Sequence, residues 1–135
     1  MKNFKGKKVL ITGGGSGIGE AMAYQYAMKG ADVILTGRNT ASLETVRNKC
    51  MKYGVKAYCH AVDMEKQETI DALVNWIYTE GHEIDFLLLN AGISQRSLTL
   101  ETDMSVDRRL MEVNYFGGIY LVKSLKDMFL KRGVH

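Results

Sequence analysis

The sequence has few of the residues that build metal centres and disulfide frameworks. It contains only two cysteines, Cys50 and Cys59, and three histidines that do not cluster, His60, His82 and His135. Neither set has the spacing of zinc ligands, and two cysteines are too few for a disulfide framework. We therefore expect no metal site, and a reducing compartment, the cytoplasm, fits this composition best.

Long apolar runs and strong net charge are also missing. No run approaches the roughly 20 residues that cross a membrane, and the N-terminus lacks the apolar core of a signal peptide. The net charge is only +3, and the lysines are scattered, apart from an N-terminal cluster of Lys5, Lys7 and Lys8. We therefore expect a soluble protein that contacts neither membrane nor nucleic acid.

The stretch from Thr12 to Gly19, Thr-Gly-Gly-Gly-Ser-Gly-Ile-Gly, lies between an apolar run at 9–11 and an amphipathic segment. Glycines allow a tight turn and a close approach to a ligand, and the first amides of the following helix are unpaired donors at the positive end of its dipole. A Walker P-loop is excluded because Glu20 stands where its lysine should be. The pattern Gly-x-Gly-x-x-Gly matches from Gly14 and predicts a dinucleotide-binding turn. The alternative is a glycine-rich turn without a ligand.

Apolar runs alternate with helical patterns along the rest of the chain. The first helix should bury Ile18, Met22 and Tyr26, and the last apolar run should be covered on both faces. Predicted strands are 9–11, 31–36, 55–62 and 84–89, and predicted helices are 16–29, 40–53, 65–80 and 105–131.

This alternation predicts an α/β fold, a Rossmann-type doubly wound parallel sheet of about four strands in the order 3-2-1-4. We expect residues 1–135 to form a single dinucleotide-binding domain. A complete fold of this type has about six strands. The chain therefore reads as incomplete, truncated before a fifth strand.

Read as Thr-Gly-x-x-x-Gly-x-Gly, the stretch from Thr12 resembles the cofactor motif of the short-chain dehydrogenase/reductase family, in its simple oxidoreductase branch. The resemblance covers essentially the whole chain but only the N-terminal half of a usual member. It implies that Asn90 holds the central sheet while Ala91 and Gly92 leave room for the adenosine ribose, and that Asp63 and Met64 meet the adenine. The residues that it implies for the glycine turn are Gly13, Gly15, Ser16, Gly17, Ile18 and Gly19.

The residues after the second predicted strand bear on the choice of cofactor. An NAD site usually has an acid there, whereas this chain has Gly37 followed by Arg38. A guanidinium suits a phosphate, so these residues favour NADP(H). Alternatives remain open, since Arg38 could be a solvated charge and Asp63 could cap the next helix. Asn39 is expected mainly to cap a helix.

Catalytic residues are mostly absent. Asn114 matches the family's helical asparagine, which the resemblance implies holds a water on a proton relay. The family also needs a serine and Tyr-x-x-x-Lys, but none of the seven tyrosines is followed four residues later by lysine. The loop 94–98 would lie near the nicotinamide.

We therefore interpret the chain as the cofactor-binding half of an NADP(H)-dependent oxidoreductase, which moves a hydride between nicotinamide and a carbonyl or alcohol substrate. Alone, it should be inactive. The open edge of the strand at 84–89 predicts a homo-oligomer. The alternative is a non-catalytic NADP-binding or partner-docking module.

Overall fold

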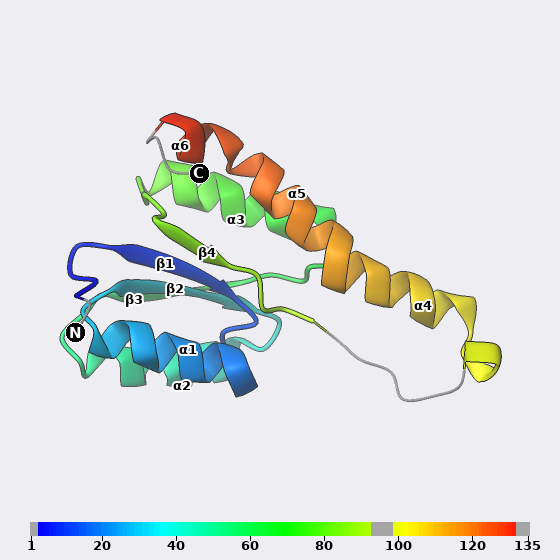
Figure 1. Ribbon diagram of the computed structural model, residues 1–135, viewed down its shortest axis with the longest axis horizontal. Coiled ribbons are helices and arrows are strands. Elements are labelled where there is room, and N and C mark those ends of the chain that lie inside the picture. Colours follow the sequence, from blue (N-terminus) through cyan, green and yellow to red (C-terminus); the bar gives the residue numbers. More distant parts are fainter. Residues whose placement is uncertain (1–2, 93–98, 132–135) are drawn as a thin grey trace.

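The computed structural model describes residues 3–92 and 99–131. Within these ranges the chain forms a parallel four-stranded sheet in the order β3-β2-β1-β4, with helices on both faces (Figure 1). The predicted doubly wound order is therefore confirmed. The strands are β1 (Lys8–Thr12), β2 (Asp32–Gly37), β3 (Ala57–Ala61) and β4 (Phe86–Leu88). The helices beside them are α1 (Gly17–Met28), α2 (Thr40–Met51), α3 (Gln67–Thr79), α4 (Met104–Met111), α5 (Gly117–Ser124) and α6 (Lys126–Lys131).

Two apolar cores lie on the two faces of the sheet. Because side chains alternate along a strand, Val9 and Ile11 of β1 pack toward α1 and α2, while Leu10 packs toward α3 and α5. Figure 1 shows α1 and α2 on one side of the sheet and α3 with α5 on the other. This double coverage explains why β1 and β2 read as uninterrupted apolar runs.

Helix α1 buries only part of the face that its large residues predict, because Met22 and Tyr26 are half-buried against the core but Ile18 is not. Ile18 is 73% exposed, whereas Gly19, Ala23 and Ala27 are buried at a spacing of four residues. A Cβ on Gly19 would meet the Gly13 carbonyl oxygen and lie 2.6 Å from Nδ2 of Asn90. The helix thus packs closely through small residues, which a reading based on large apolar side chains overlooks.

The predicted helix over 105–131 is divided into several segments. A π-helical segment, Glu112–Phe116, separates α4 from α5, and a short break at Leu125 precedes α6. At the end of the π segment, a Cβ on Gly117 would contact the Met64 carbonyl oxygen. Leu121, Leu125 and Met128 are buried, whereas the N-terminal part of the predicted helix is largely exposed. A short 3₁₀ turn, Thr99–Glu101, precedes α4.

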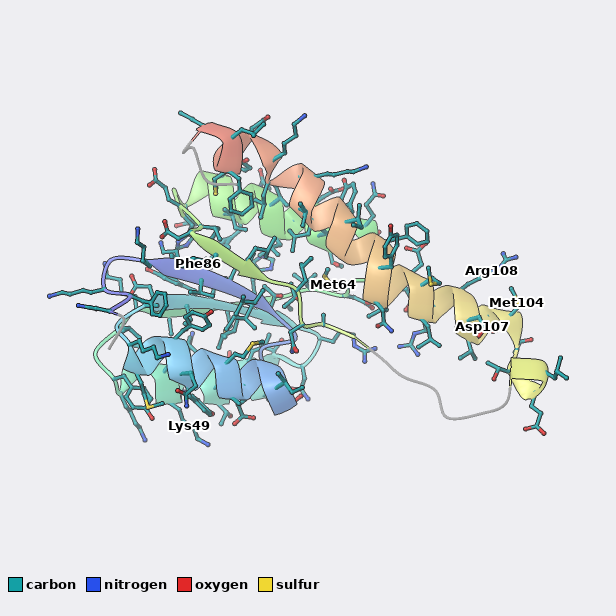
Figure 2. All side chains as sticks on the ribbon, in the orientation of Figure 1. Lys49, Met64, Phe86, Met104, Asp107 and Arg108 are labelled. Atoms are coloured by element: carbon teal, nitrogen blue, oxygen red, sulfur yellow. The ribbon has the colours of Figure 1, made fainter. Side chains whose placement is uncertain are left out.

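Strand β4 is shorter and less covered than its apolar sequence suggests. Leu88 packs against one core and Leu87 against the other, but Phe86 is 39% and Leu89 is 50% exposed, so the expected coverage of both faces is only partial. In the described residues, β4 pairs with β1 alone, and its other edge is left without a neighbouring strand. Phe86 lies at the start of β4 (Figure 2), and its ring packs at 5.8 Å, centre to centre, against that of Phe4. None of the helices in the described ranges combines the length and apolar character needed to cross a bilayer.

A buried histidine joins β1, β3 and α3 at the amino ends of the strands. Nζ of Lys8 lies 2.8 Å from Nδ1 of His82. Because an ammonium has no acceptor, Lys8 donates this bond and His82 must be neutral with its proton on Nε2. The imidazole is 6% exposed and lies 4.6 Å from the rings of both Tyr58 and Trp76. Burial lowers the pKa of His82 below its usual value, and the Lys8 ammonium lowers it further.

We expect acid to destabilise the fold through His82. In the unfolded chain the imidazole takes up a proton near pH 6.5, whereas the folded protein resists this until the pH is lower. The free energy of unfolding contributed by His82 is therefore fully present above about pH 6.5 and is lost as the pH falls toward the folded-state pKa. Chemical denaturation between neutral pH and about pH 5 checks this, because His82→Gln should flatten the pH dependence. His60→Gln is the control, and an equally steep curve in His82→Gln would contradict the assignment.

Candidate functional site

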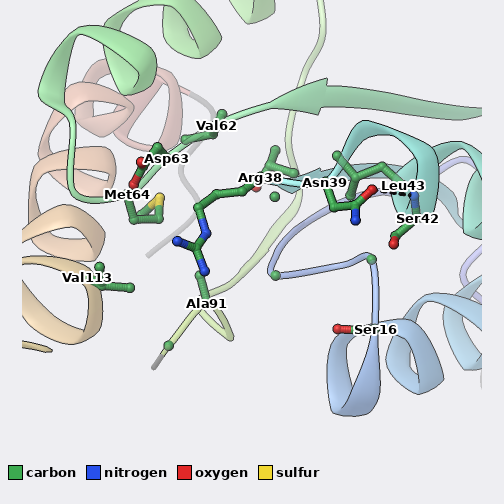
Figure 3. Close-up of a pocket in the computed structure, with 15 residues that line it drawn as sticks. Ser16, Arg38, Asn39, Ser42, Leu43, Val62, Asp63, Met64, Ala91 and Val113 are labelled. Atoms are coloured by element: carbon green, nitrogen blue, oxygen red, sulfur yellow. Dashed lines mark hydrogen bonds between the residues drawn. The ribbon is translucent and has the colours of Figure 1, made fainter. Parts of the chain in front are cut away.

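A hollow of about 320 Å³ opens at the carboxyl ends of β1, β2 and β4 (Figure 3). This is the point at which the order of the strands reverses, where open α/β sheets bind their ligands. Predicted cofactor residues from separate segments of the chain meet there. Those that line the hollow are Gly13, Gly15, Ser16, Arg38, Asp63, Met64, Ala91 and Gly92.

The glycine turn presents backbone amides at the edge of this hollow. Gly13 and Gly17 have φ of +67° and +56°, a conformation that favours glycine. The amide of Gly14 donates to the Thr36 carbonyl oxygen at 3.0 Å, which ties the turn to β2. Ser16 is the N-cap of α1, but its side chain makes no capping bond. The first-turn amides of α1 thus keep their donors for an anionic ligand.

Gly13 also permits close contact between two loops. A Cβ on this residue would lie 2.9 Å from Cα of Ala91 and 3.2 Å from Nδ2 of Asn90. The side-chain amide of Asn90 donates a hydrogen bond to the Gly13 carbonyl oxygen at 3.2 Å. Gly19 and Asn90 therefore support the turn from behind and do not line the hollow, and Gly17 and Ile18 do not line it either. Their predicted contacts with a cofactor stay predictions.

Thr12 fixes the position of the residues that follow β4. Its buried hydroxyl accepts hydrogen bonds from the backbone amides of Asn90 and Ala91, each at 2.9 Å. The same hydroxyl donates to the Leu88 carbonyl oxygen at 3.4 Å. The sequence motif marks Thr12 only as its first residue and gives no hint of this role. A threonine at the end of an otherwise apolar buried strand was the signal, since a buried hydroxyl requires partners.

Arg38 reaches into the hollow from the end of β2. Figure 3 shows its guanidinium extending toward Met64 and Ala91. Among the described lining residues, Arg38 is the only cation and Asp63 the only carboxylate. Asn39 caps α2, as expected, by accepting the Ser42 amide at 3.0 Å.

The hydroxyl of Thr69 binds both the backbone amide and the backbone carbonyl of Asp63. The Asp63 amide donates to Oγ1 of Thr69 at 3.0 Å, and its carbonyl oxygen accepts from the same hydroxyl at 2.7 Å. Its carboxylate accepts the Glu65 amide at 3.0 Å, whereas the N-cap of α3 is Lys66. Asp63 therefore forms a local turn before α3 and is not the capping residue of that helix.

Asn114 lies behind the turn at 90–92 and does not line the main hollow. It is part of the π-helical segment and lines a smaller hollow of about 160 Å³ with Thr12, Leu89 and Ala91. A Cβ on Gly92 would lie 3.1 Å from its Oδ1, so the two segments are close. The predicted substrate loop at 94–98 lies outside the described residues.

We expect Thr12→Val to destabilise the protein because the two part-buried amides of Asn90 and Ala91 would lose their acceptor. Each unsatisfied buried donor costs about 1–3 kcal/mol. Denaturant unfolding should therefore show a loss of about 2 kcal/mol or more. Thr36→Val is the matched control, because the Thr36 hydroxyl makes only a long bond of 3.5 Å to the Ile11 carbonyl oxygen. Equal losses in the two variants would show that the Thr12 hydroxyl has no special role.

Comparisons with known proteins agree with this geometry. The family model "short chain dehydrogenase" matches residues 7–134. A Drosophila melanogaster dehydrogenase/reductase SDR family protein 7-like is 38% identical over 132 residues, which cover 95% of this chain and 40% of the relative. The chain thus spans less than half the length of this curated relative.

Solved structures show the same fold. L-sorbose reductase from Gluconobacter frateurii, complexed with NADPH and L-sorbose, has a TM-score of 0.91 and 29% identity, covering 97% of this chain and 50% of that one. An NAD⁺-bound xylitol dehydrogenase also has a TM-score of 0.91, with 26% identity, and the match covers 98% of this chain and 52% of that one. Together with the sheet order and the glycine turn, the match of the family model shows that this chain belongs to the short-chain dehydrogenase/reductase family.

Proposed function

We propose that the chain is the nucleotide-binding part of an NADP(H)-dependent oxidoreductase that transfers a hydride between nicotinamide and a carbonyl or alcohol carbon. The observation that carries this proposal is the position of Arg38 in the hollow at the end of β2. The bound nicotinamide would supply the carbon that gives or takes the hydride. The chain's own residues would bind and orient the nucleotide.

The phosphate on the 2′ position distinguishes the two cofactors, and the end of β2 favours its presence. Gly37 has no side chain there, and the guanidinium of Arg38 can donate two parallel hydrogen bonds to a phosphate. Both NADPH and NAD⁺ occur in the structural relatives, so the fold alone does not decide the choice. The local charge, a single arginine with no acid at the end of β2, supports NADP(H).

The other lining residues suit the remaining parts of the nucleotide. The glycine turn and the first amides of α1 would hold the pyrophosphate. Asp63 and Met64 form the wall opposite the turn and would meet the adenine, while Ala91 and Gly92 leave space for the ribose. These roles follow the family's pattern, and the position of these residues in the lining of the hollow supports the proposal.

The chemistry of proton transfer would need residues that this sequence does not provide. Asn114 would hold a water near the turn at 90–92, in line with its place in the family's relay. Because neither Tyr-x-x-x-Lys nor the matching serine occurs in the 135 residues, we expect NADPH binding without turnover of a carbonyl substrate. Such behaviour in the whole natural protein would instead favour a non-catalytic NADP-binding module.

We expect Arg38→Ala to weaken NADPH binding far more than NADH binding. The charge-assisted hydrogen bonds contribute on the order of 1.5–3 kcal/mol, or about ten- to a hundredfold in the dissociation constant. Gly37→Asp should act in the same direction by placing a carboxylate beside the 2′-phosphate. The aspartate can be accommodated, since a Cβ at Gly37 would lie 3.4 Å from Leu43 Cδ2, an ordinary contact.

Fluorescence titration with both cofactors measures these effects. Arg108→Ala, at the far end of α4 in Figure 2, is the control for loss of one arginine and should leave both constants unchanged. Equal weakening of NADPH and NADH by Arg38→Ala would reject the NADP assignment.

We further propose that the chain self-associates through the exposed edge of β4. Its apolar side chains Phe86 and Leu89 are exposed, and an apolar edge strand is a template for pairing with another chain. Phe86→Lys should weaken the association, because a charge on an edge strand opposes pairing. Met104→Lys is the control, since Met104 is also apolar and exposed but lies on α4. Sedimentation velocity distinguishes the two, and a monomeric wild type would refute the proposal.

A further inference from the structure

The fold gathers lysines that are scattered in the sequence onto one end of the molecule. The amino ends of the parallel strands and the carboxyl ends of α1 and α2 lie at the same end (Figure 1). Lysines occur in the loops before β1 and β3 and at the C-caps of both helices, and exposed apolar side chains lie between them. We call this surface the basic tip, and it consists of Lys5, Lys7, Met28, Lys29, Met51, Lys52, Tyr53 and Lys56.

Backbone contacts hold several of these residues side by side. The Phe4 amide donates to the Lys29 carbonyl oxygen at 2.8 Å, and Nζ of Lys29 lies 5.9 Å from the centre of the Phe4 ring. The Asp32 amide donates to the Lys7 carbonyl oxygen at 2.9 Å, and its carboxylate accepts the Lys56 amide at 2.9 Å. Lys7 and Lys56 therefore flank the same residue at the start of β2.

A hollow of about 490 Å³ forms the centre of the basic tip. Lys5, Met28, Lys29 and Tyr53 contribute to its lining, and the described lining residues include no carboxylate. The acids at this end of the molecule, including Glu83 and Asp85, line a separate hollow around Gly6. One of these acids, Asp32, lies between Lys7 and Lys56 and marks the border of the basic surface.

Compensation of helix dipoles explains only part of this arrangement. Lys29 and Lys52 stand at the C-caps of α1 and α2, where a positive charge is favourable. Lys5, Lys7 and Lys56 lie on connecting loops and have no such role. Met28, Met51 and Tyr53 are each about half exposed, although they are among the more apolar residues of these helix ends.

We propose that the basic tip binds the surface of an anionic lipid bilayer, in contrast to the expectation of no membrane contact that the scattered lysines of the sequence give. All its cations are lysines, compact charges on flexible chains that are attracted to anionic headgroups without a fixed geometry. Methionine and the amphipathic ring of tyrosine suit the boundary between headgroups and acyl chains. The nucleotide hollow opens at the opposite ends of the strands, so a chain held by the basic tip keeps this hollow accessible. The contact is peripheral and requires no membrane-spanning helix.

Vesicle flotation tests the proposal with the full 135-residue chain. Flotation is preferred because self-associated protein sinks while vesicle-bound protein rises. The chain should float with mixed phosphatidylcholine–phosphatidylserine vesicles at low salt and not with pure phosphatidylcholine vesicles. Lys52→Gln/Lys56→Gln should lower the partition coefficient about tenfold or more. Arg108→Gln/Lys123→Gln, which removes the same charge from α4 and α5, should lower it less than about twofold.

Further measurements distinguish attachment through the basic tip from nonspecific adhesion and from nucleic-acid binding. Binding should disappear near 1 M salt, where the Debye length falls to about 3 Å. Tyr53→Ser should weaken binding several-fold at unchanged net charge. Three results would overturn the proposal. The first two are equal losses in the two charge variants and equal binding to neutral vesicles. The third is binding to duplex DNA that depends on Lys52 and Lys56 and is tighter than binding to the anionic vesicles. An unchanged denaturant-unfolding curve for Lys52→Gln/Lys56→Gln would show that the variant is folded. Because this control does not use the cofactor, a failure of the cofactor proposal leaves the test unaffected.

Discussion

The hydroxyl of Thr12 makes the contact on which the candidate site most depends. It joins the end of β1 to the backbone that leaves β4, through the amides of Asn90 and Ala91. Because Gly13 carries no side chain, the glycine turn can then lie directly against Ala91. Two loops that are far apart in the sequence thus become adjacent walls of one hollow.

Small residues and local hydrogen bonds also hold the remaining walls of the hollow in place. Gly19 lets α1 approach the turn, and Gly117 lets the π-helical segment approach the Met64 backbone. Thr69 fixes both backbone groups of Asp63. The walls of the hollow are thus held by contacts within the chain, and its chemical character comes from Arg38 and Asp63, its charged lining residues.

The sequence was sufficient to predict the order of the strands, which follows from the alternation of apolar runs and helical patterns. About half of the lining of the hollow was also predicted, from the glycine motif, from Arg38 after the second strand and from the family resemblance. The sequence was insufficient where packing is carried by residues with little apolar signal. Ile18 looks like a core residue but is exposed, since Ala23 and Ala27 allow a closer approach to the sheet. The π segment gives no periodic signal, and the gathering of Lys5, Lys29 and Lys56 arises only when the strands are placed side by side.

Binding of a nucleotide with a 2′-phosphate in this hollow is tested most directly by comparing two fragments by NMR. Titration of the isotopically labelled chain with 2′,5′-ADP should shift the amides of Gly15, Gly17, Arg38 and Asp63, and its affinity should be higher than that of 5′-AMP by about tenfold or more. Equal affinities for the two fragments would contradict the assignment of the 2′-phosphate to Arg38. Shifts confined to other parts of the chain would contradict the site itself.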